Sequence, residues 1–482
     1  KPMANIPFPH KLVLNRYMLG LFGAETFEQL ANRLKDESLE GRNEEGLSRF
    51  HLEIGALLPK DSPITVDDLR QYDENISRHT NRINRKRSSR IEWKYFQYLA
   101  LLFTEVYLDA FFRDVDGLLE RLNAFLDNFN EGLLERGTKK DRLEPFTKDG
   151  LRKLAFWNAT GSGKTLLMHV NILQYQHYLA KAGRRHELNR VVVLTPNERL
   201  TEQHLKEFHA AGMPAAPFDK DRSGSSTSLL TGQIIDVIDM NKLREEGKKK
   251  TVSVDQFETN NLVLIDEGHR GASGDVWSQM RQRLARDGFT FEYSATLGQA
   301  AAGSKDLTDE YAKAILFDYS YRYFYADGFG KDFAILNIDD ESGTAKGQEH
   351  RRLYLTAGLL SYYQQLRLYE ERQSDYKAFL IEKPLLVFVG GKVTAVRTVN
   401  KRKVSDVVDI LLFIAEFIKD KAHTLGHIET LLSGNTGLLD AKNHDIFREA
   451  FPFLQKSGLT AEAIYTDILA RLFNSTTDAL LH

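Results

Sequence analysis

Short apolar runs alternate with amphipathic stretches through the middle of the chain, from residue 146 to about residue 330. A run of four to six apolar residues is typical of a buried strand, and apolar positions three and four residues apart are typical of a helix with one buried face. The alternation predicts an α/β fold, with a parallel sheet wrapped by crossover helices. The predicted strands are Leu154–Trp157, Val191–Leu194, Ile234–Ile238, Leu262–Ile265 and Phe289–Tyr293.

The part of the chain before this region has a different pattern. Residues 1–145 carry apolar side chains at helical spacing. The clearest examples are residues 91–112 and 118–134, where each apolar stripe would bury one helix face. We therefore predict an N-terminal helical accessory region.

A further unit begins near residue 345 and extends to residue 482. The apolar run 384–391 predicts a buried strand that ends in a glycine turn, and residues 405–418 predict an amphipathic helix after it. A strand followed by a helix is the repeating unit of a parallel sheet. Residues 345–482 are thus predicted to be the start of a second α/β domain, apparently truncated.

The composition of the chain excludes several classes of protein and of binding site. A chain of 482 residues is long enough for roughly two to four domains. It has no cysteine, which excludes disulfides, zinc–cysteine sites and iron–sulfur clusters and suits a reducing cytoplasm. No apolar run approaches the roughly 20 residues of a membrane-spanning helix, so we expect no membrane contact. The formal net charge is −2, so any contact with nucleic acid depends on a local basic patch.

The segment from Asn158 to Thr165 joins the first predicted strand to a predicted helix. Its small residues allow backbone N–H groups to turn toward a phosphate at the positive end of the helix dipole. We expect Lys164 to reach the β- and γ-phosphates and Thr165 to bind Mg²⁺. The general pattern of such loops has a glycine where this chain has Asn158, so the identification depends on motifs farther along the chain. The residues predicted to hold ATP are Thr160, Gly161, Ser162, Gly163, Lys164 and Thr165.

Two further polar segments come directly after predicted strands. Asp266 and Glu267 end an apolar run about a hundred residues after the loop. Asp266 is predicted to hold Mg²⁺, and Glu267 to orient and deprotonate the attacking water. Ser294 and Thr296 come after the last predicted strand. Because ligands bind at the carboxyl ends of parallel strands in α/β sheets, we expect all three segments at one site.

These segments resemble motifs I, II and III of superfamily 2 helicases and translocases of the DExH type. Residues 194–200, continuing to Gln203 and Phe208, are similar to motif Ia in the helicase subunits of type III restriction enzymes. Residues 266–271 read Asp-Glu-Gly-His-Arg-Gly, as in bacterial DEAD/DEAH box proteins related to that subunit. The resemblance implies a RecA-like domain over residues 146–330 that binds ATP and Mg²⁺. It also implies that residues 345–482 are a partial second RecA-like domain.

The resemblance implies roles for several other residues. It assigns His269, with the acids before it, to coupling the γ-phosphate to the second domain. Ser294 and Thr296 would couple ATP hydrolysis to motion. Pro196 and Asn197 lie in the segment like motif Ia, whose backbone N–H groups would grip nucleic-acid phosphates without reading bases.

Two features have both a functional and a structural interpretation. Gln97 resembles the adenine-reading glutamine found upstream of motif I in this superfamily, since its amide can both donate and accept, as adenine requires. It can equally be a glutamine on a helix surface. The cations between residues 82 and 90 can bind phosphates or form a solvated face. They are Arg82, Arg85, Lys86, Arg87 and Arg90.

One expected motif is absent from the sequence. A complete superfamily 2 motor carries Gln-x-x-Gly-Arg-x-x-Arg in its second domain, and the arginine finger of that motif offsets charge on the transferring phosphate. The chain has no such segment. Loss of an arginine finger typically costs a factor of ~10³ or more in hydrolysis rate. We therefore expect a fragment of a longer protein or a divergent second domain, and poor ATP hydrolysis by this chain alone.

The sequence as a whole predicts an ATPase that acts as a helicase or translocase on nucleic acid, with DNA favoured over RNA by the resemblance. The resemblance further implies bacterial defence against foreign DNA, together with a partner nuclease. An alternative is an ATP-gated sensor or scaffold that clamps nucleic acid or a protein without unwinding, which the long N-terminal helical region favours. A phosphate-loop kinase is disfavoured by Glu267, because a water-activating acid has no use in transfer to a small acceptor.

Overall fold

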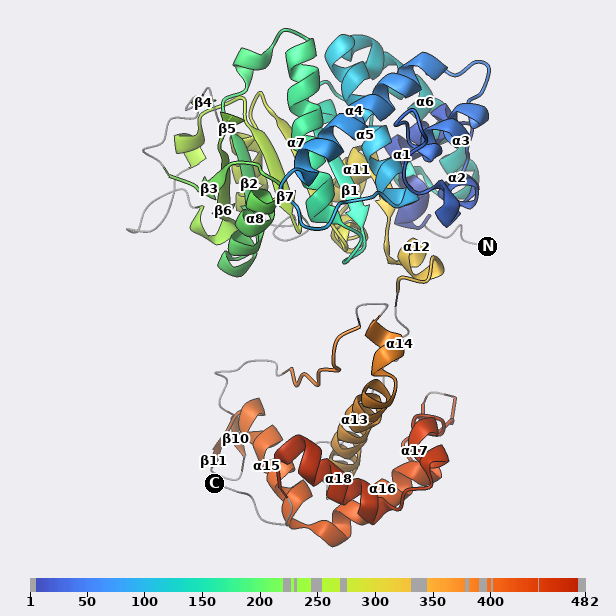
Figure 1. The fold of residues 1–482 in the computed structure, drawn as a ribbon, viewed down its shortest axis with the longest axis vertical. Helices are drawn as coiled ribbons and strands as arrows, with labels where there is room; N and C mark the ends of the chain where they lie inside the picture. The colour runs from blue at the N-terminus through green and yellow to red at the C-terminus, as the bar shows by residue number, and fades with distance from the viewer. Residues whose placement is uncertain are drawn as a thin grey trace. The chain divides into compact units, whose positions relative to one another are not determined.

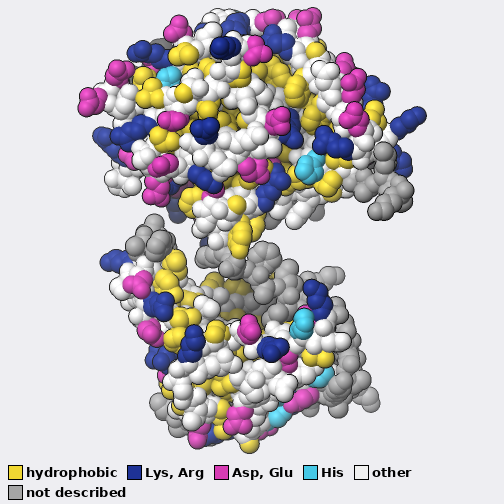
Figure 2. Space-filling view, turned by 90° about the vertical axis from the view of Figure 1, so that its right-hand side faces the viewer, with side chains coloured by type: hydrophobic (Ala, Val, Ile, Leu, Met, Phe, Trp, Pro, Cys, Tyr) yellow, Lys and Arg dark blue, Asp and Glu magenta, His cyan; other side chains and the backbone are white. Residues whose placement is uncertain are grey.

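The computed structural model describes residues 6–219, 227–228, 232–243, 254–268, 275–330, 345–377, 381–389, 397–399, 402–440 and 442–475. The chain divides into two compact units, residues 1–331 and residues 332–482, and each is described by itself (Figure 1). On the face shown in Figure 2, Lys and Arg side chains are interspersed with Asp and Glu side chains on each unit, in keeping with the small net charge.

The first unit is built on a seven-stranded parallel sheet with the strand order β3-β6-β2-β7-β8-β1-β9. The predicted α/β fold is confirmed, and the five predicted strands correspond to β1, β2, β6, β7 and β8. The structure adds an edge strand at each side, β3 and β9. The bounds are β1 (Lys153–Asn158), β2 (Val191–Thr195), β3 (Ala215–Pro217), β6 (Ile235–Asp239), β7 (Leu262–Asp266), β8 (Phe289–Ser294) and β9 (Ile315–Tyr319), with a separate pair β4 (Thr227–Ser228) and β5 (Gly232–Gln233).

The chain before the sheet is helical, as predicted, and its apolar residues join the core of the sheet. The helix α5 is buried along almost its whole length because it is apolar on all sides, and it packs on both α7 and β9. The helices are α1 (Val13–Leu21), α2 (Phe27–Leu34), α3 (Arg49–Leu57), α4 (Val66–Asn84), α5 (Tyr95–Arg113) and α6 (Val115–Arg136). The later helices of the unit are α7 (Lys164–Lys181), α8 (Glu198–Ala210), α9 (Asp275–Leu284), α10 (Leu297–Ala301), α11 (Lys305–Ala314) and α12 (Tyr321–Ala326).

The described part of the second unit is mainly helical, with one short hairpin. The helix predicted at residues 405–418 is confirmed by α15, whose first turn is capped by the Ser405 hydroxyl. The unit has its own apolar core, made by α13, α15, α16, α17 and α18. The bounds are α13 (Ala345–Glu371), α14 (Gln373–Lys377), β10 (Arg397–Val399), β11 (Arg402–Val404), α15 (Asp406–Lys419), α16 (Lys421–Ser433), α17 (Pro452–Ser457) and α18 (Ala461–Phe473).

The strand predicted at residues 384–391 does not form in the part of it that the structure describes. Residues 381–389 have no regular structure, and Leu385 and Val389 are 82% and 89% exposed. A buried strand needs hydrogen-bonded neighbours on both sides, and the only strands described in this unit pair with each other as β10 and β11. That residues 345–482 begin a second RecA-like domain stays a prediction.

None of the described helices has the combination of length and apolar composition that crossing a bilayer requires.

Candidate nucleotide-binding site

The three predicted motifs meet at the carboxyl edge of the sheet, where β7, β8 and β1 are neighbours. The register pairs Trp157 of β1 with Ser294 of β8, and Asp266 of β7 with Tyr293 of β8. The strand tips are therefore level with one another. This arrangement brings three segments to one place, as their spacing predicts. They are the phosphate loop (residues 158–165), the acidic pair (Asp266 and Glu267) and the Ser-Ala-Thr segment (residues 294–296).

The phosphate loop has a backbone that only glycine adopts easily. Gly161 and Gly163 have φ values of 88° and 92°, and Gly163 forms the N-terminal cap of α7. A Cβ on Gly163 would lie 2.5 Å from Gln97 Nε2, so that side chain would have to move to make room for it. The loop thus turns its backbone toward the start of a long helix, which is the geometry that holds phosphates.

The loop also holds buried polar atoms that have no hydrogen-bond partner among the described residues. These atoms are Nδ2 and Oδ1 of Asn158 and Oγ of Ser162. Both residues are almost fully inaccessible to solvent. Buried polar groups are normally paired, so orphaned ones call for an explanation such as a missing ligand or water. A phosphate-bearing ligand with its metal and waters supplies both donors and acceptors, so these residues fit a nucleotide.

Lys164 lies between the loop and the acidic pair. Its Nζ donates to the carbonyl oxygen of Asn158 at 3.4 Å and is 3.8 Å from Glu267 Oε1. The side chain is only 10% exposed. A single ammonium is therefore held at the point where the phosphate loop and the acidic pair converge.

The acidic pair is fixed by its own backbone and by one histidine. Asp266 Oδ1 accepts the N–H of Glu267 at 3.0 Å, and Asp266 Oδ2 is 3.0 Å from His204 Nε2. Because a carboxylate can only accept, His204 donates from Nε2. Glu267 has a φ of 54°, an unusual value for a residue with a Cβ and one that is often found at functional sites.

His204 is a site residue that the sequence did not reveal. It lies on α8, between Gln203 and Phe208 of the stretch that resembles motif Ia, and its side chain is buried. Its place on the apolar face of an amphipathic helix gives it the appearance of a core histidine. Only the packing of α8 against the sheet, where it contacts β2, β3 and β6, brings its ring to Asp266.

A buried ionic network supports the backbone just after the acidic pair. Arg281 donates to the carbonyl oxygen of Gly268 at 2.8 Å and lies 3.6 Å from Glu292 Oε1. Glu292 is also 2.8 Å from Lys153 Nζ and accepts the Tyr311 hydroxyl at 2.8 Å. Burial opposes ionisation of Glu292, but Lys153 and Arg281 outweigh it and hold the pKa of this carboxyl below its ordinary value.

The Ser-Ala-Thr segment makes hydrogen bonds within itself and with β1. The Thr296 N–H donates to Ser294 Oγ at 3.0 Å, and the two hydroxyl oxygens are 3.4 Å apart. Trp157 on β1 donates from its indole to the Ala295 carbonyl at 3.0 Å. The segment is thereby held beside the strand that leads into the phosphate loop. Its coupling role stays a prediction.

The structure brings Gln97 into contact with the phosphate loop. Gln97 Nε2 donates to the Ser162 carbonyl at 2.9 Å, and its Oε1 accepts the Lys94 N–H at 3.0 Å. The glutamine is thus not an isolated surface residue. Both ends of its amide have protein partners, and its predicted contact with adenine is not tested.

The predicted nucleic-acid residues lie at the end of β2, on the same sheet edge. Asn197 caps α8 by accepting the Leu200 N–H at 3.0 Å, and the buried Pro196 accepts Asn241 Nδ2 on its carbonyl at 3.0 Å. These contacts explain the local fold, and a nucleic-acid contact by either residue stays a prediction. His269 lies outside the described residues.

Comparison with known families points to the same chemistry. Residues 119–299 match the family described as type III restriction enzyme, res subunit. The predicted relationship is confirmed. The matched segment contains the phosphate loop, the acidic pair and the Ser-Ala-Thr segment, and it indicates an ATP-dependent enzyme of the helicase class that uses ATP and acts on nucleic acid. A search of curated proteins found no match.

Proposed function

We propose that this protein is an ATP-driven motor of the helicase or translocase type that moves on DNA. The observation that carries the proposal is the convergence of Lys164, Asp266 and Glu267 at one sheet edge, within the segment that matches the res subunit. A phosphate loop alone is common to many enzymes. A phosphate loop that faces an acid able to activate water is suited to hydrolysis of ATP.

In this proposal, different residues of the site bind the nucleotide, hold the metal ion and activate water. Backbone N–H groups of the loop and the ammonium of Lys164 would hold the phosphates. Thr165 and Asp266 would hold Mg²⁺, which offsets negative charge on the phosphate oxygens when bound. Glu267, whose side chain is 24% exposed, would orient a water molecule and take its proton. His204 would keep Asp266 oriented as a ligand.

Movement along a strand needs further residues to report the state of the nucleotide. We assign this coupling to Ser294, Thr296 and His269, and contact with nucleic-acid phosphates to Pro196 and Asn197. The relationship to restriction enzymes supports DNA as the track. It also supports a role in bacterial defence in the cytoplasm, alongside a partner nuclease.

A second candidate is an ATP-gated sensor that clamps nucleic acid without unwinding it. The observation in its favour is that the helices before the sheet share its core and reach the nucleotide site, since Gln97 of α5 donates to Ser162 in the phosphate loop. A change in the phosphate loop on nucleotide binding can thus be transmitted to helices outside the sheet.

The test is to measure ATP hydrolysis and strand displacement side by side on the native protein, with duplex DNA, single-stranded DNA and RNA. A motor is expected to hydrolyse ATP faster with DNA and to displace a labelled strand, and Thr296→Ala is expected to reduce displacement more than hydrolysis. DNA-stimulated hydrolysis without displacement or translocation would favour the sensor. No response to any nucleic acid would contradict both proposals.

A further inference from the structure

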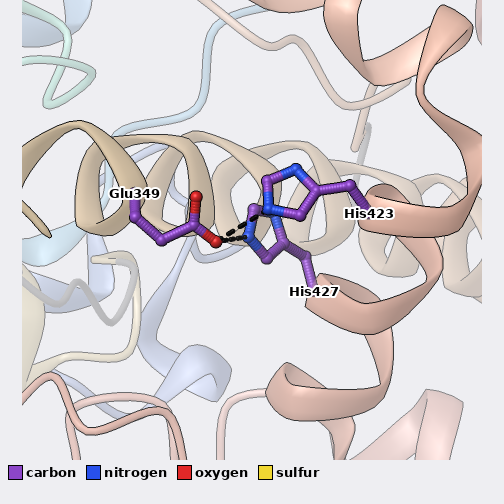
Figure 3. Close-up of side chains that lie close together, drawn as sticks. All are labelled: Glu349, His423 and His427. Atoms are coloured by element: carbon purple, nitrogen blue, oxygen red, sulfur yellow. Dashed lines mark hydrogen bonds and ion pairs between the residues drawn. The ribbon is translucent and has the colours of Figure 1, made fainter. Parts of the chain in front are cut away.

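Three potential metal ligands meet in the second unit, whereas the residues assigned to ATP all belong to the first unit. Figure 3 shows the carboxylate of Glu349, on α13, pointing toward the rings of His423 and His427, which both come from α16. Glu349 Oε1 lies 2.8 Å from His423 Nε2 and 2.7 Å from His427 Nε2. The three donor atoms all lie within 4.8 Å of one another.

The local fold explains why these side chains meet. His423 and His427 are four residues apart on one helix, so their rings lie on the same face, with centroids 4.3 Å apart. Asp420 caps the start of α16 by accepting the His423 N–H at 3.3 Å, which orders the first turn. The helix α13 packs on α16 through the apolar core of the unit. The ligands are therefore presented by two packed helices and not by loops.

The type of each donor indicates which ions suit the cluster. Two imidazole nitrogens and one carboxylate oxygen are ligands that Zn²⁺ and its first-row neighbours accept, whereas Mg²⁺ and Ca²⁺ prefer oxygen alone. Two histidines and a glutamate are also a known ligand set for zinc sites that keep one position open.

The geometry needs a small adjustment to accept an ion. Tetrahedral zinc with bonds of about 2.0 to 2.1 Å places its donor atoms about 3.3 Å apart. The Glu349 oxygen would thus move back from each ring by about half an ångström, which a side-chain rotation provides. Glu349 and His423 are 47% and 37% exposed, so an ion can enter from solvent, while His427 is only 10% exposed and anchors the site.

We propose that Glu349, His423 and His427 form a binding site for a divalent transition metal, with Zn²⁺ as the best match, in which water completes the coordination. The bound ion clips α13 to α16. It is separate from the Mg²⁺ expected at Thr165 and Asp266, because its donors are mainly nitrogen and all belong to the second unit.

The experiment is a titration of the untagged chain with Zn²⁺ alone and with Co²⁺ alone, after removal of metals by a chelator. Wild-type protein is expected to bind one ion at this cluster, to give the visible absorption of Co²⁺ held by nitrogen and oxygen ligands, and to melt at a higher temperature with Zn²⁺. A large excess of Mg²⁺ should displace neither ion. Absence of Zn²⁺ and Co²⁺ binding by the wild-type chain would overturn the proposal.

Substitutions assign the bound ion to these residues. Glu349→Gln and His423→Gln are expected to weaken Zn²⁺ binding by at least about tenfold, as ligand losses do. His444→Gln is the matched control, because His444 is an exposed histidine whose partner, Asp440, is likewise a carboxylate 3.7 Å away. Circular dichroism of the variants without metal checks that they fold. Equal Zn²⁺ affinity in wild type and in folded Glu349→Gln would overturn the assignment.

Discussion

At the scale of single residues, the candidate nucleotide site brings together a lysine and a glutamate from two motifs, Lys164 and Glu267. Lys164 Nζ has only the Asn158 carbonyl, at 3.4 Å, and the Glu267 carboxylate, at 3.8 Å, within reach among the contacts described. Phosphate oxygens carry more charge than a carbonyl and accept shorter hydrogen bonds. The arrangement therefore leaves the ammonium available to a nucleotide. The positive φ of Glu267 aims its side chain at a cost of order 1 kcal/mol in backbone strain.

Lys164→Ala is expected to abolish nucleotide binding, because the substitution removes the main positive charge on the β- and γ-phosphates. Titration of a fluorescent ATP analogue measures the effect directly. Lys305→Ala, at an exposed lysine that begins α11, is a control that should bind like wild type. Near-normal affinity in Lys164→Ala would show that this loop is not the nucleotide site.

Glu267→Gln is expected to leave binding of ATP and Mg²⁺ intact while hydrolysis falls by roughly 10²- to 10⁴-fold, the usual contribution of a general base. Hydrolysis is measured on the native protein with DNA present. Glu258→Gln is a matched control, since Glu258 is an exposed glutamate that also has a positive φ, of 58°, but lies outside the motifs. Turnover like wild type in Glu267→Gln would place the base elsewhere.

At the scale of elements, a buried carboxylate joins the N-terminal helices to the helix that begins at the phosphate loop. Glu105 on α5 accepts the Tyr178 hydroxyl at 2.6 Å and Gln174 Nε2 at 2.8 Å, both from α7, and Asn75 Nδ2 from α4 at 3.0 Å. Burial raises the pKa of Glu105 from 4.5 to about 7, although the three donors act in the other direction. We therefore expect the contact between the helical region and the sheet domain to be sensitive to pH.

The direction in which stability changes with pH follows from the difference in the pKa of Glu105 between the folded and the unfolded chain. The unfolded chain ionises Glu105 near pH 4.5, while the folded chain keeps the proton to about pH 7, so ionisation favours unfolding between these values. The contribution of Glu105 to stability should fall by about 3 kcal/mol over this range and then stay level. Glu105→Gln is expected to remove this part of the pH dependence.

Urea denaturation of wild type and Glu105→Gln at pH 5 and pH 8 measures the difference. The exposed Glu53 on α3 provides the control Glu53→Gln, which should behave like wild type at both values. If the gap in unfolding free energy between wild type and Glu105→Gln is the same at pH 5 and pH 8, the predicted coupling is wrong.

At the scale of the whole molecule, we predict that the phosphate loop and the acidic pair hold a nucleotide, but the sequence lacks the arginine motif that the resemblance to superfamily 2 motors leads us to expect. The phosphate loop, the acidic pair and the Ser-Ala-Thr segment all belong to one unit, within the segment that matches the res subunit. The resemblance implies that this arginine belongs to the second domain. We therefore predict that binding and hydrolysis depend on different parts of the protein.

This chain is expected to bind ATP and to hydrolyse it slowly, whatever nucleic acid is added, because charge that develops on the γ-phosphate has no arginine opposite it. Single-turnover hydrolysis with labelled ATP measures the rate, and a binding titration on the same sample shows that the site is intact. Rapid turnover stimulated by nucleic acid would contradict the prediction. It would mean that another arginine, such as Arg270 or one from another subunit, completes the site.

The sequence alone determined the features that depend on neighbours in the chain. Backbone conformation at Gly161 and Gly163 depends on residue type, and the five predicted strands come from short, mainly apolar runs. Because the carboxyl ends of parallel strands share one edge, the order of the motifs was enough to predict that Lys164, Asp266 and Glu267 meet.

Only the tertiary structure decided which side chains meet from distant helices. His204 reaches Asp266, Gln97 reaches the phosphate loop and Glu349 reaches two histidines because helices pack in one particular way, and no local pattern encodes that packing. The apolar run at residues 384–391 is an example in which a local pattern predicted an element that does not form in the residues described. Its composition favours a strand, but a strand forms only where neighbours supply its hydrogen bonds, and the described part of the second unit supplies none.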